Sequence, residues 1–150
     1  MHSLNIIHRD IKLDNVVFLP SGEHSISIKI IDFGTAVQTT HKVEHNFPIA
    51  GTLSYLAPEV LGEVLTEKSD IWSSAVLMYI LLTGASPFKS KNEKETKRNI
   101  VKKVLKYNQK PLKDISDEAK DLLKLMFNRN IHDRISAIDA LQHRWLSIPS

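Results

Sequence analysis

Carboxylates, an amide and a lysine lie close together near the start of the chain, in residues 8–15 (HRDIKLDN) and residues 32–34 (DFG). Transfer of a phosphoryl group needs an in-line hydroxyl, a group that receives its proton, and positive charge beside the phosphate oxygens. Asp10 can orient the hydroxyl and take its proton, and Lys12 can place an ammonium beside the phosphate. The Asn15 amide oxygen and the Asp32 carboxylate are hard ligands suited to Mg²⁺. These residues therefore predict phosphoryl-transfer chemistry.

A β-hairpin would bring Asn15 and Asp32 together. Residues 16–19 are β-prone, residues 20–22 (PSG) predict a turn, and residues 26–30 alternate apolar with polar as a returning strand does. With Val16 roughly opposite Ile31, the two ligands fall at the same open end of the hairpin. Gly34 would then let the chain turn sharply without a side-chain clash.

The two motifs are followed by residues 51–59 (GTLSYLAPE), and this order and spacing resemble the catalytic loop, metal-binding loop and P+1 region of protein kinases. Residues 69–84 resemble the central buried helix of the kinase large lobe, and residues 133–145 resemble its last helices. The segments ILLTG with SPF, and SAxxALxHxW, resemble calcium- and calmodulin-dependent kinases most. The resemblance implies a mainly α protein-kinase-like fold with a small β-hairpin, the large lobe only, over residues 1–150 as one partial domain.

The resemblance also implies an activity. The placement of Lys12 is similar to the Arg-Asp-x-Lys-x-x-Asn pattern of serine/threonine kinases, so we expect ATP and Mg²⁺ as cofactors and protein Ser/Thr hydroxyls as substrates. No Asp-x-Asp/Asn-x-Asp/Asn-Gly loop occurs in the sequence. A calcium-linked regulatory segment would therefore lie outside these residues.

By resemblance, individual residues acquire roles in catalysis and binding. The catalytic set is Asp10, Lys12, Asn15 and Thr52, with Thr52 contacting Asp10 and Lys12. The cofactor set is Lys12, Asn15, Val17, Ile31 and Asp32, in which Val17 and Ile31 flank the floor of the adenine pocket or simply pack in the core. The metal ligands are Asn15 and Asp32.

Other residues acquire structural or regulatory roles in the same way. Glu59 would pair with Arg134 in a buried ion pair, and Asp70 would hold the backbone of the catalytic loop. His8 and Phe33 would be apolar supports, and Gly34 the turn residue. Arg9 would pair with a phosphorylated residue or an acid, for which the candidates are Thr39, Thr40 and Glu44.

Composition agrees with an intracellular, cytoplasmic domain. The chain has 150 residues, 42% of them hydrophobic, and no cysteine, which excludes a disulfide-stapled secreted fold. No signal peptide is visible, and the apolar stretch 71–82 is far shorter than the ~20 residues that span a bilayer. We predict that it is a core helix that begins with Ser69 or Asp70 as its N-cap and stops at Gly84.

Two later segments predict further helices. Ser116 begins the first, and Ala119, Leu122, Leu123 and Met126 then form a core stripe at i, i+3, i+4 and i+7. Ser136 begins the second, which would pack through Ala137, Ala140, Leu141, Arg144 and Trp145.

Basic residues are concentrated in one segment. Residues 89–113 hold ten Lys and Arg against two Glu, a net charge of +8, whereas the rest of the chain holds ten against fifteen, a net of −5. Tyr107 is the sole aromatic residue in this segment, which favours a solvated helix face over nucleic-acid or membrane binding. In kinases this region resembles a helix that docks substrates or regulators.

The small lobe has no counterpart in the sequence. A Gly-rich loop, a strand lysine and a hinge would have to precede Asp10, and only nine residues do so. We therefore expect Met1 to be an internal methionine of a longer kinase, the missing small lobe to be a partner of this chain, and the chain alone to be inactive. The alternative is a non-enzymatic scaffold that resembles a pseudokinase and keeps only a docking surface, although such a scaffold would not need all four catalytic residues.

Overall fold

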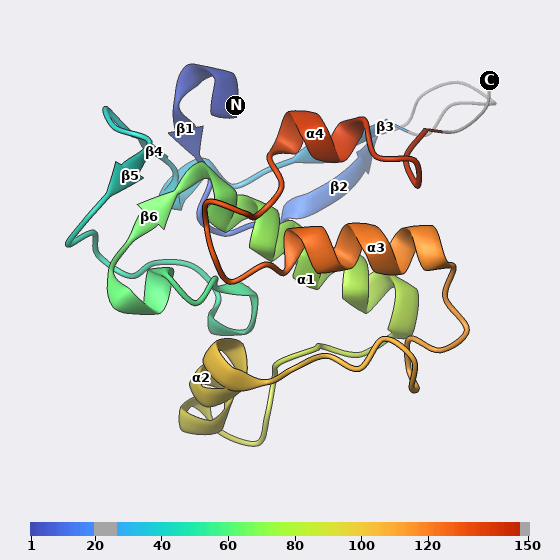
Figure 1. The fold of residues 1–150 in the computed structure, drawn as a ribbon. Coiled ribbons are helices and arrows are strands. Elements are labelled where there is room, and N and C mark those ends of the chain that lie inside the picture. The colour runs from blue at the N-terminus through green and yellow to red at the C-terminus, as the bar shows by residue number, and fades with distance from the viewer. Residues whose placement is uncertain (20–26, 148–150) are drawn as a thin grey trace.

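Helices dominate the computed structural model, which describes residues 1–19 and 27–147. Within these residues the α-helices are α1 (Glu67–Thr83), α2 (Glu93–Lys102), α3 (Asp117–Met126) and α4 (Ala137–Leu141). The strands are β1 (Ile6–Ile7), β2 (Val16–Leu19), β3 (Ser27–Ile30), β4 (Val37–Gln38), β5 (Val43–Glu44) and β6 (Leu65–Thr66). Single turns of 3₁₀ helix are η1 (His2–Leu4), η2 (Leu13–Asn15), η3 (Phe33–Thr35), η4 (Leu53–Tyr55) and η5 (Val60–Gly62). The mainly α prediction is confirmed (Figure 1).

Helix α1 begins earlier than predicted. Thr66 is its N-cap: the Thr66 hydroxyl accepts from the Lys68 amide at 2.9 Å, and the Ser69 hydroxyl accepts from the Thr66 amide at 3.3 Å. This reciprocal capping box satisfies two amide groups that the first turn leaves open. Ser69 therefore belongs inside the helix, so the prediction of an N-cap at Ser69 or Asp70 is wrong. The predicted stop is confirmed at Gly84, whose positive φ of 72° suits glycine.

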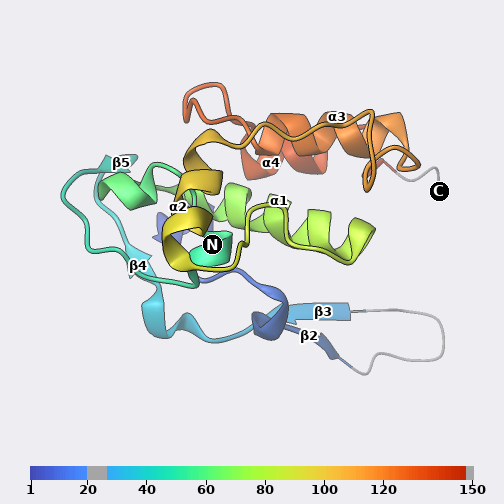
Figure 2. The ribbon, with the colours of Figure 1, turned by 90° about the horizontal axis from the view of Figure 1, so that it is seen from below.

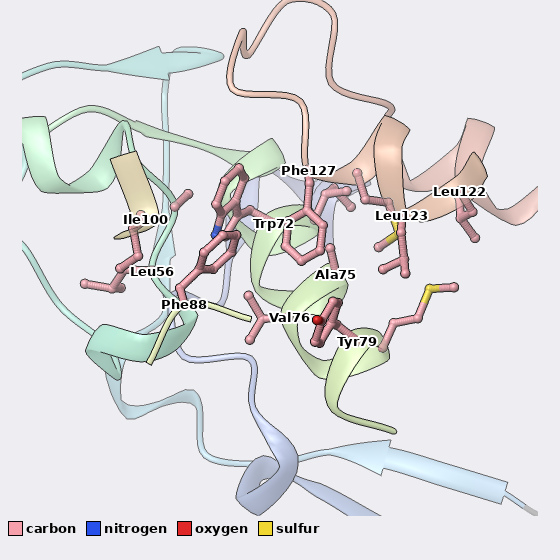
Figure 3. Packing of buried hydrophobic residues seen from close by; sticks show 14 of the residues in the cluster. Leu56, Trp72, Ala75, Val76, Tyr79, Phe88, Ile100, Leu122, Leu123 and Phe127 are labelled. Atoms are coloured by element: carbon pink, nitrogen blue, oxygen red, sulfur yellow. The ribbon is translucent and has the colours of Figure 1, made fainter. Parts of the chain in front are cut away.

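The core is built around α1, which lies between the hairpin β2–β3 and the pair α3 and α4 (Figure 2). Trp72 is fully buried; its ring stacks on Phe88 at 5.3 Å between centroids and meets Phe127 edge-on at 5.1 Å (Figure 3). Burial of one such side chain contributes roughly 1.5–3 kcal/mol. The predicted core helix is confirmed, and among the described residues no helix has the length and apolar character needed to cross a membrane.

The apolar stripe of α3 is confirmed, because all four predicted residues are buried. In α4 the Ser136 hydroxyl caps the Asp139 amide at 3.2 Å, and Ala140 is buried as predicted. Leu141 is 71% exposed, so its predicted packing is wrong. A residue directly after a buried one is turned about 100° around a helix, so Leu141 points away from the side on which Ala140 packs.

The β2–β3 hairpin is antiparallel, with Val16 opposite Ile30. The predicted register of Val16 with Ile31 is therefore wrong by one residue: the Ile31 amide donates to the Asn15 carbonyl at 2.9 Å instead. The predicted turn at residues 20–22 and the first residue of the predicted strand, Ile26, lie outside the described residues. Two further antiparallel pairs, β1–β4 and β5–β6, join strands of two residues each, which are too short to show a periodic pattern.

Candidate active site

Three polar side chains converge on Asp10, which lies on the loop between β1 and η2. One Asp10 carboxylate oxygen accepts from the Thr52 amide at 2.9 Å and from its hydroxyl at 2.8 Å. The other oxygen lies 2.7 Å from the Lys12 ammonium and accepts from the Asn15 amide nitrogen at 3.2 Å. Lys12 also donates to the Thr52 hydroxyl at 3.0 Å. The structure thus brings together all four residues of the predicted catalytic set.

The charges of this cluster stabilise one another. Burial alone would raise the pKa of Asp10, but hydrogen bonds from Lys12 and Thr52 and the charge of Lys12 outweigh it, so the pKa lies below its ordinary value. The hydrogen bond to Asp10 raises the pKa of Lys12, and the charges of Asp10, Asp14 and Asp32 raise it further. At neutral pH the site therefore holds an ionised carboxylate, which can accept a proton, beside a cation.

Asp70 of α1 holds the backbone of this loop. Its carboxylate oxygens accept from the His8 amide at 2.8 Å and from the Arg9 amide at 2.9 Å, and His2 lies 2.9 Å away through its Nε2. Arg9 has φ of 73°, a conformation that costs of order 1–3 kcal/mol for a residue with a side chain. The three contacts of the buried Asp70 therefore stabilise a strained residue directly before Asp10.

The hairpin presents Asn15, Val17 and Ile31 on one face. Asn15 lies opposite Ile31 and Val17 opposite Lys29, and residues opposite each other or two apart share a face of a sheet. Asn15 is buried and uses its amide nitrogen toward Asp10, and among the described residues no hydrogen bond reaches its amide oxygen. The predicted cofactor residues Asn15, Val17 and Ile31, which lie on β2 or directly beside the ends of β2 and β3, therefore share one face of the hairpin.

Asp32 follows this face directly. It takes a left-handed conformation with φ of 63°, and its carboxylate accepts from the Gly34 amide at 3.2 Å. A Cβ on Gly34 would lie 3.1 Å from that carboxylate oxygen. Asp32, rather than Gly34, makes the sharp turn, and Gly34 leaves room for the carboxylate. An amide oxygen and a carboxylate oxygen fit the ligand preference of Mg²⁺, which takes few protein ligands and shares them with phosphates.

His8 and Phe33 differ in burial. The His8 ring is fully buried, lies 3.1 Å from the Ile31 carbonyl through its Nε2, and meets the Phe33 ring edge-on at 4.8 Å. Phe33 is 53% exposed. Phe33 therefore contacts the buried His8 ring, but Phe33 is not itself a buried core residue.

A buried ion pair joins Glu59 to Arg134. The Arg134 guanidinium donates to the two Glu59 oxygens at 2.6 and 2.8 Å, and also to the Lys68 and Asn128 carbonyls, both at 2.8 Å. Ser69 donates to the same carboxylate at 3.0 Å. Residue 59 ends the segment that begins at Asp32, so this pair ties that segment to α1 and to the loop before α4.

Arg9 does not meet the predicted regulatory residues. Its guanidinium lies over the Phe47 ring at 5.1 Å and donates to the Pro48 carbonyl at 3.5 Å. Glu44 accepts from the Thr40 and His41 amides at 3.1 and 3.0 Å, and these bonds lower its pKa, that from His41 most. Thr39 donates its amide to the Asn5 carbonyl at 2.9 Å. In this structure Glu44 caps a local turn rather than balancing Arg9.

Two residues that help to position the loop of the candidate site escaped the sequence reasoning. His2 contacts Asp70 across 68 positions of sequence, and no local pattern marks such a contact. Gly51 has φ of 100°, and a Cβ there would lie 2.2 Å from the Arg9 carbonyl. In the sequence, the one sign that position 51 needs a glycine was its place directly before Thr52 in the GTLSYLAPE segment.

Residues 1–146 match the family model of the protein kinase domain. The chain belongs to the protein kinase family. This confirms the resemblance noted in the sequence, and the helices and hairpin correspond to the large lobe of the kinase fold.

Relatives with high similarity to this kinase chain are named calcium-dependent protein kinases. Calcium-dependent protein kinase 4 of Plasmodium berghei is 39% identical over 148 residues, which are 99% of this chain and 28% of the relative. Calcium-dependent protein kinase 5 of Plasmodium falciparum is 40% identical over 145 residues, 96% of this chain and 25% of the relative. Calcium-dependent protein kinase SK5 of Glycine max is 38% identical over 146 residues, which are 97% of this chain and 28% of the relative. The chain spans about a quarter of the length of these relatives.

Proposed function

We propose that this chain is the large-lobe part of a serine/threonine protein kinase that transfers the γ-phosphoryl group of Mg·ATP to protein hydroxyls. The observation that carries the proposal is the cluster in which Asp10 is bound at once by Lys12, Asn15 and Thr52. Phosphoryl transfer relies on positioning and charge more than on covalent chemistry. The cluster supplies a fixed carboxylate and a fixed ammonium in one place.

In the proposed reaction each residue has one task. Asp10 accepts a hydrogen bond from the substrate hydroxyl, aligns it and takes its proton. Lys12 stands beside the phosphate oxygens and stabilises the charge that spreads over them. Thr52 fixes the carboxylate of Asp10 through two hydrogen bonds, so that the orientation needs no rearrangement when the substrate binds.

The cofactor would be held by the hairpin. Asn15 and Asp32 would bind Mg²⁺ through oxygen, and Val17 and Ile31 would form the floor under the adenine. When bound, Mg²⁺ neutralises charge on the phosphates. Asn15 would link the two parts of the site, because its nitrogen donates to Asp10 and its oxygen would be left for the metal.

Activity assays of the full-length product of the transcript that encodes this chain test the proposal. Asp10→Asn should lower kcat by about 10²–10⁴-fold and leave the KM for ATP nearly unchanged, because Asp10 acts on the hydroxyl. Asp32→Asn should raise the Mg²⁺ concentration needed for half-maximal rate. Asp114→Asn, an exposed acid outside the site, is the matched control. Equal kinetics for the wild type and Asp10→Asn would contradict the role of Asp10.

For the 150-residue chain alone we propose no measurable activity. Two metal ligands and a hairpin floor offer few contacts against association costs of at least ~4 kcal/mol. Purified residues 1–150 should neither phosphorylate serine peptides nor show a thermal shift with Mg·ATP. The scaffold alternative predicts the same for the full-length product, so activity of that product separates the two functions.

A further inference from the structure

A cation–π contact joins the loop of Asp10 to the segment that leads to Thr52. The Arg9 guanidinium lies over the Phe47 ring at 5.1 Å and donates to the Pro48 carbonyl at 3.5 Å. The family resemblance predicted a phosphorylated residue or an acid in this place. Among residues 1–19 and 27–147, no carboxylate lies within 4 Å of this guanidinium. In the described part of the chain, an aromatic ring and a carbonyl are therefore its partners.

Phe47 is held in place on its other side. Its amide donates to the Glu63 carbonyl at 2.9 Å, and its half-buried side chain packs against the hydrophobic core. Glu63 in turn caps the carboxyl end of η5. The ring therefore meets Arg9 from a backbone that is already fixed, and such a contact costs little further conformational entropy.

The contact is closely packed. The cavity between Arg9, Phe47 and Asp70 has a volume of about 10 Å³, which is room for about one water molecule. Burial lowers the pKa of Arg9, and the charge of Asp70 opposes this in part. An arginine side chain stays protonated in proteins, so a charged group that is partly withdrawn from water faces the ring. Withdrawal from water strengthens a cation–π contact.

Beyond Phe47 the segment stays against the same loop. A Cβ on Gly51 would lie 2.2 Å from the Arg9 carbonyl, so the two backbones touch there. The next residue, Thr52, donates to the Asp10 carboxylate through its amide and its hydroxyl. The contacts of Phe47 and of Gly51 therefore fix both ends of the stretch that places Thr52.

We propose that Phe47 is a positioning residue for the phosphoryl transfer, because its ring face binds the Arg9 guanidinium and thereby sets Thr52 against the Asp10 carboxylate. The part of this inference that concerns phosphoryl transfer rests on the proposed function, whereas the placement of Thr52 does not. A cation above an aromatic ring is attracted by the negative face of the π system. An aliphatic side chain of similar size has no such face and would not replace the ring.

Fluorinated phenylalanines at position 47 test the ring face. Fluorine withdraws electron density from the face and changes the shape of the ring little, so the attraction should fall stepwise from one fluorine to three. Hydrogen exchange of the Thr52 amide, followed by NMR in residues 1–150, should become about three- to fivefold faster with three fluorines, the loss expected for a cation–π contact. In Arg9→Met, which lacks the cation, the same fluorines should leave the exchange rate unchanged. The matched control is the same fluorination of Phe18, whose side chain is 76% exposed, and it should not affect Thr52.

Natural side chains and a kinetic assay complete the test. Phe47→Leu should speed Thr52 exchange at least as much as three fluorines do, whereas Phe47→Trp should keep the wild-type rate, because tryptophan has the strongest π face. In the full-length product, three fluorines on Phe47 should lower kcat about three- to fivefold and leave the KM for ATP unchanged.

Each result has a clear meaning. Equal Thr52 exchange for all the fluorinated rings would overturn the proposal, since packing alone does not depend on fluorine. An equal effect of fluorine in Arg9→Met would overturn it as well. An active wild type whose kcat is insensitive to fluorine would refute the role of Phe47 in the reaction. If fluorine speeds Thr52 exchange but the wild-type full-length product phosphorylates no protein, the proposed function fails and the placement of Thr52 by Phe47 stands.

Discussion

Arg134 is the side chain whose loss should harm this fold most. It is almost completely buried and makes four hydrogen bonds, two to Glu59 and one each to the Lys68 and Asn128 carbonyls, while its guanidinium lies 5.2 Å from the centre of the Trp72 ring. Arg134→Met keeps much of the volume but leaves Glu59 as a buried carboxylate with Ser69 as its remaining partner. Removal of one member of a buried ion pair costs about 3–5 kcal/mol.

Urea unfolding of residues 1–150, followed by circular dichroism, measures this loss. With a slope of about 2 kcal/mol per molar urea, the midpoint should fall by about 2 M. Arg144→Met is the matched control, because Arg144 is 63% exposed in side-chain terms and lies 3.5 Å from Asp121 in a surface pair. Such pairs contribute about 0–1 kcal/mol, so its midpoint should fall by less than about 0.5 M.

A double-mutant cycle with Glu59→Gln isolates the pair itself. The coupling free energy between the two positions should be about 1–3 kcal/mol, because the side chains share two hydrogen bonds. If Arg134→Met and Arg144→Met cost the same, or if the cycle shows no coupling, the view of this pair as the anchor of the segment ending at Glu59 is refuted.

Three further predictions use the same preparation. Gly51→Ala should lower the free energy of unfolding by about 1–3 kcal/mol, because of its positive φ and the clash with the Arg9 carbonyl, whereas Gly62→Ala, with open space around it, should cost less than about 1 kcal/mol in the same urea assay. Folding lowers the pKa of Asp10, so its ionised form stabilises the protein at pH values above its ordinary pKa of 3.8. This stabilisation is lost as the pH falls through the lower pKa of the folded state. The difference in free energy of unfolding between wild type and Asp10→Asn should therefore be constant above about pH 5 and change below it. Burial and the charge of Tyr79 raise the pKa of Tyr107 to about 12, against a smaller lowering by the charge of Arg129. The rise in absorbance of ionised tyrosine near pH 10 should therefore be the same for Tyr107→Phe as for the wild type.

Local sequence was enough for the parts that depend on residue type and spacing. The stripe of α3, the stop of α1 at Gly84 and the motifs around Asp10 and Asp32 are local patterns, and the structure contains each of them. The candidate catalytic residues could be named because few side chains can take a proton or bind Mg²⁺, and because their order in the chain matches a known family.

Tertiary structure decided which of several chemically equivalent groups does each task. Thr66, Ser69 and Asp70 can all cap a helix; Thr66 does so because Ser69 also binds Glu59 and Asp70 binds the loop before Asp10. The hairpin register shifted by one residue because the Asn15 carbonyl pairs with the Ile31 amide, a choice that periodicity alone leaves open.

Three long-range contacts, of Thr52 with Asp10, of Asp70 with the loop before Asp10 and of Glu59 with Arg134, were predicted only through the family resemblance, and other long-range contacts had no signal in the sequence. The partner of His2 lies 68 positions away, and the need for glycine at position 51 comes from a carbonyl of Arg9 that only folding brings close. A sequence records which groups are available along the chain, whereas the distances between groups far apart in it come from the packing of α1 with the elements around it. For this protein, the amino-acid sequence by itself determined the candidate chemistry and the main helices. The tertiary structure alone decided where α1 begins, which hairpin residues pair, and which distant groups, such as His2 and Gly51, meet at the loop that carries Asp10.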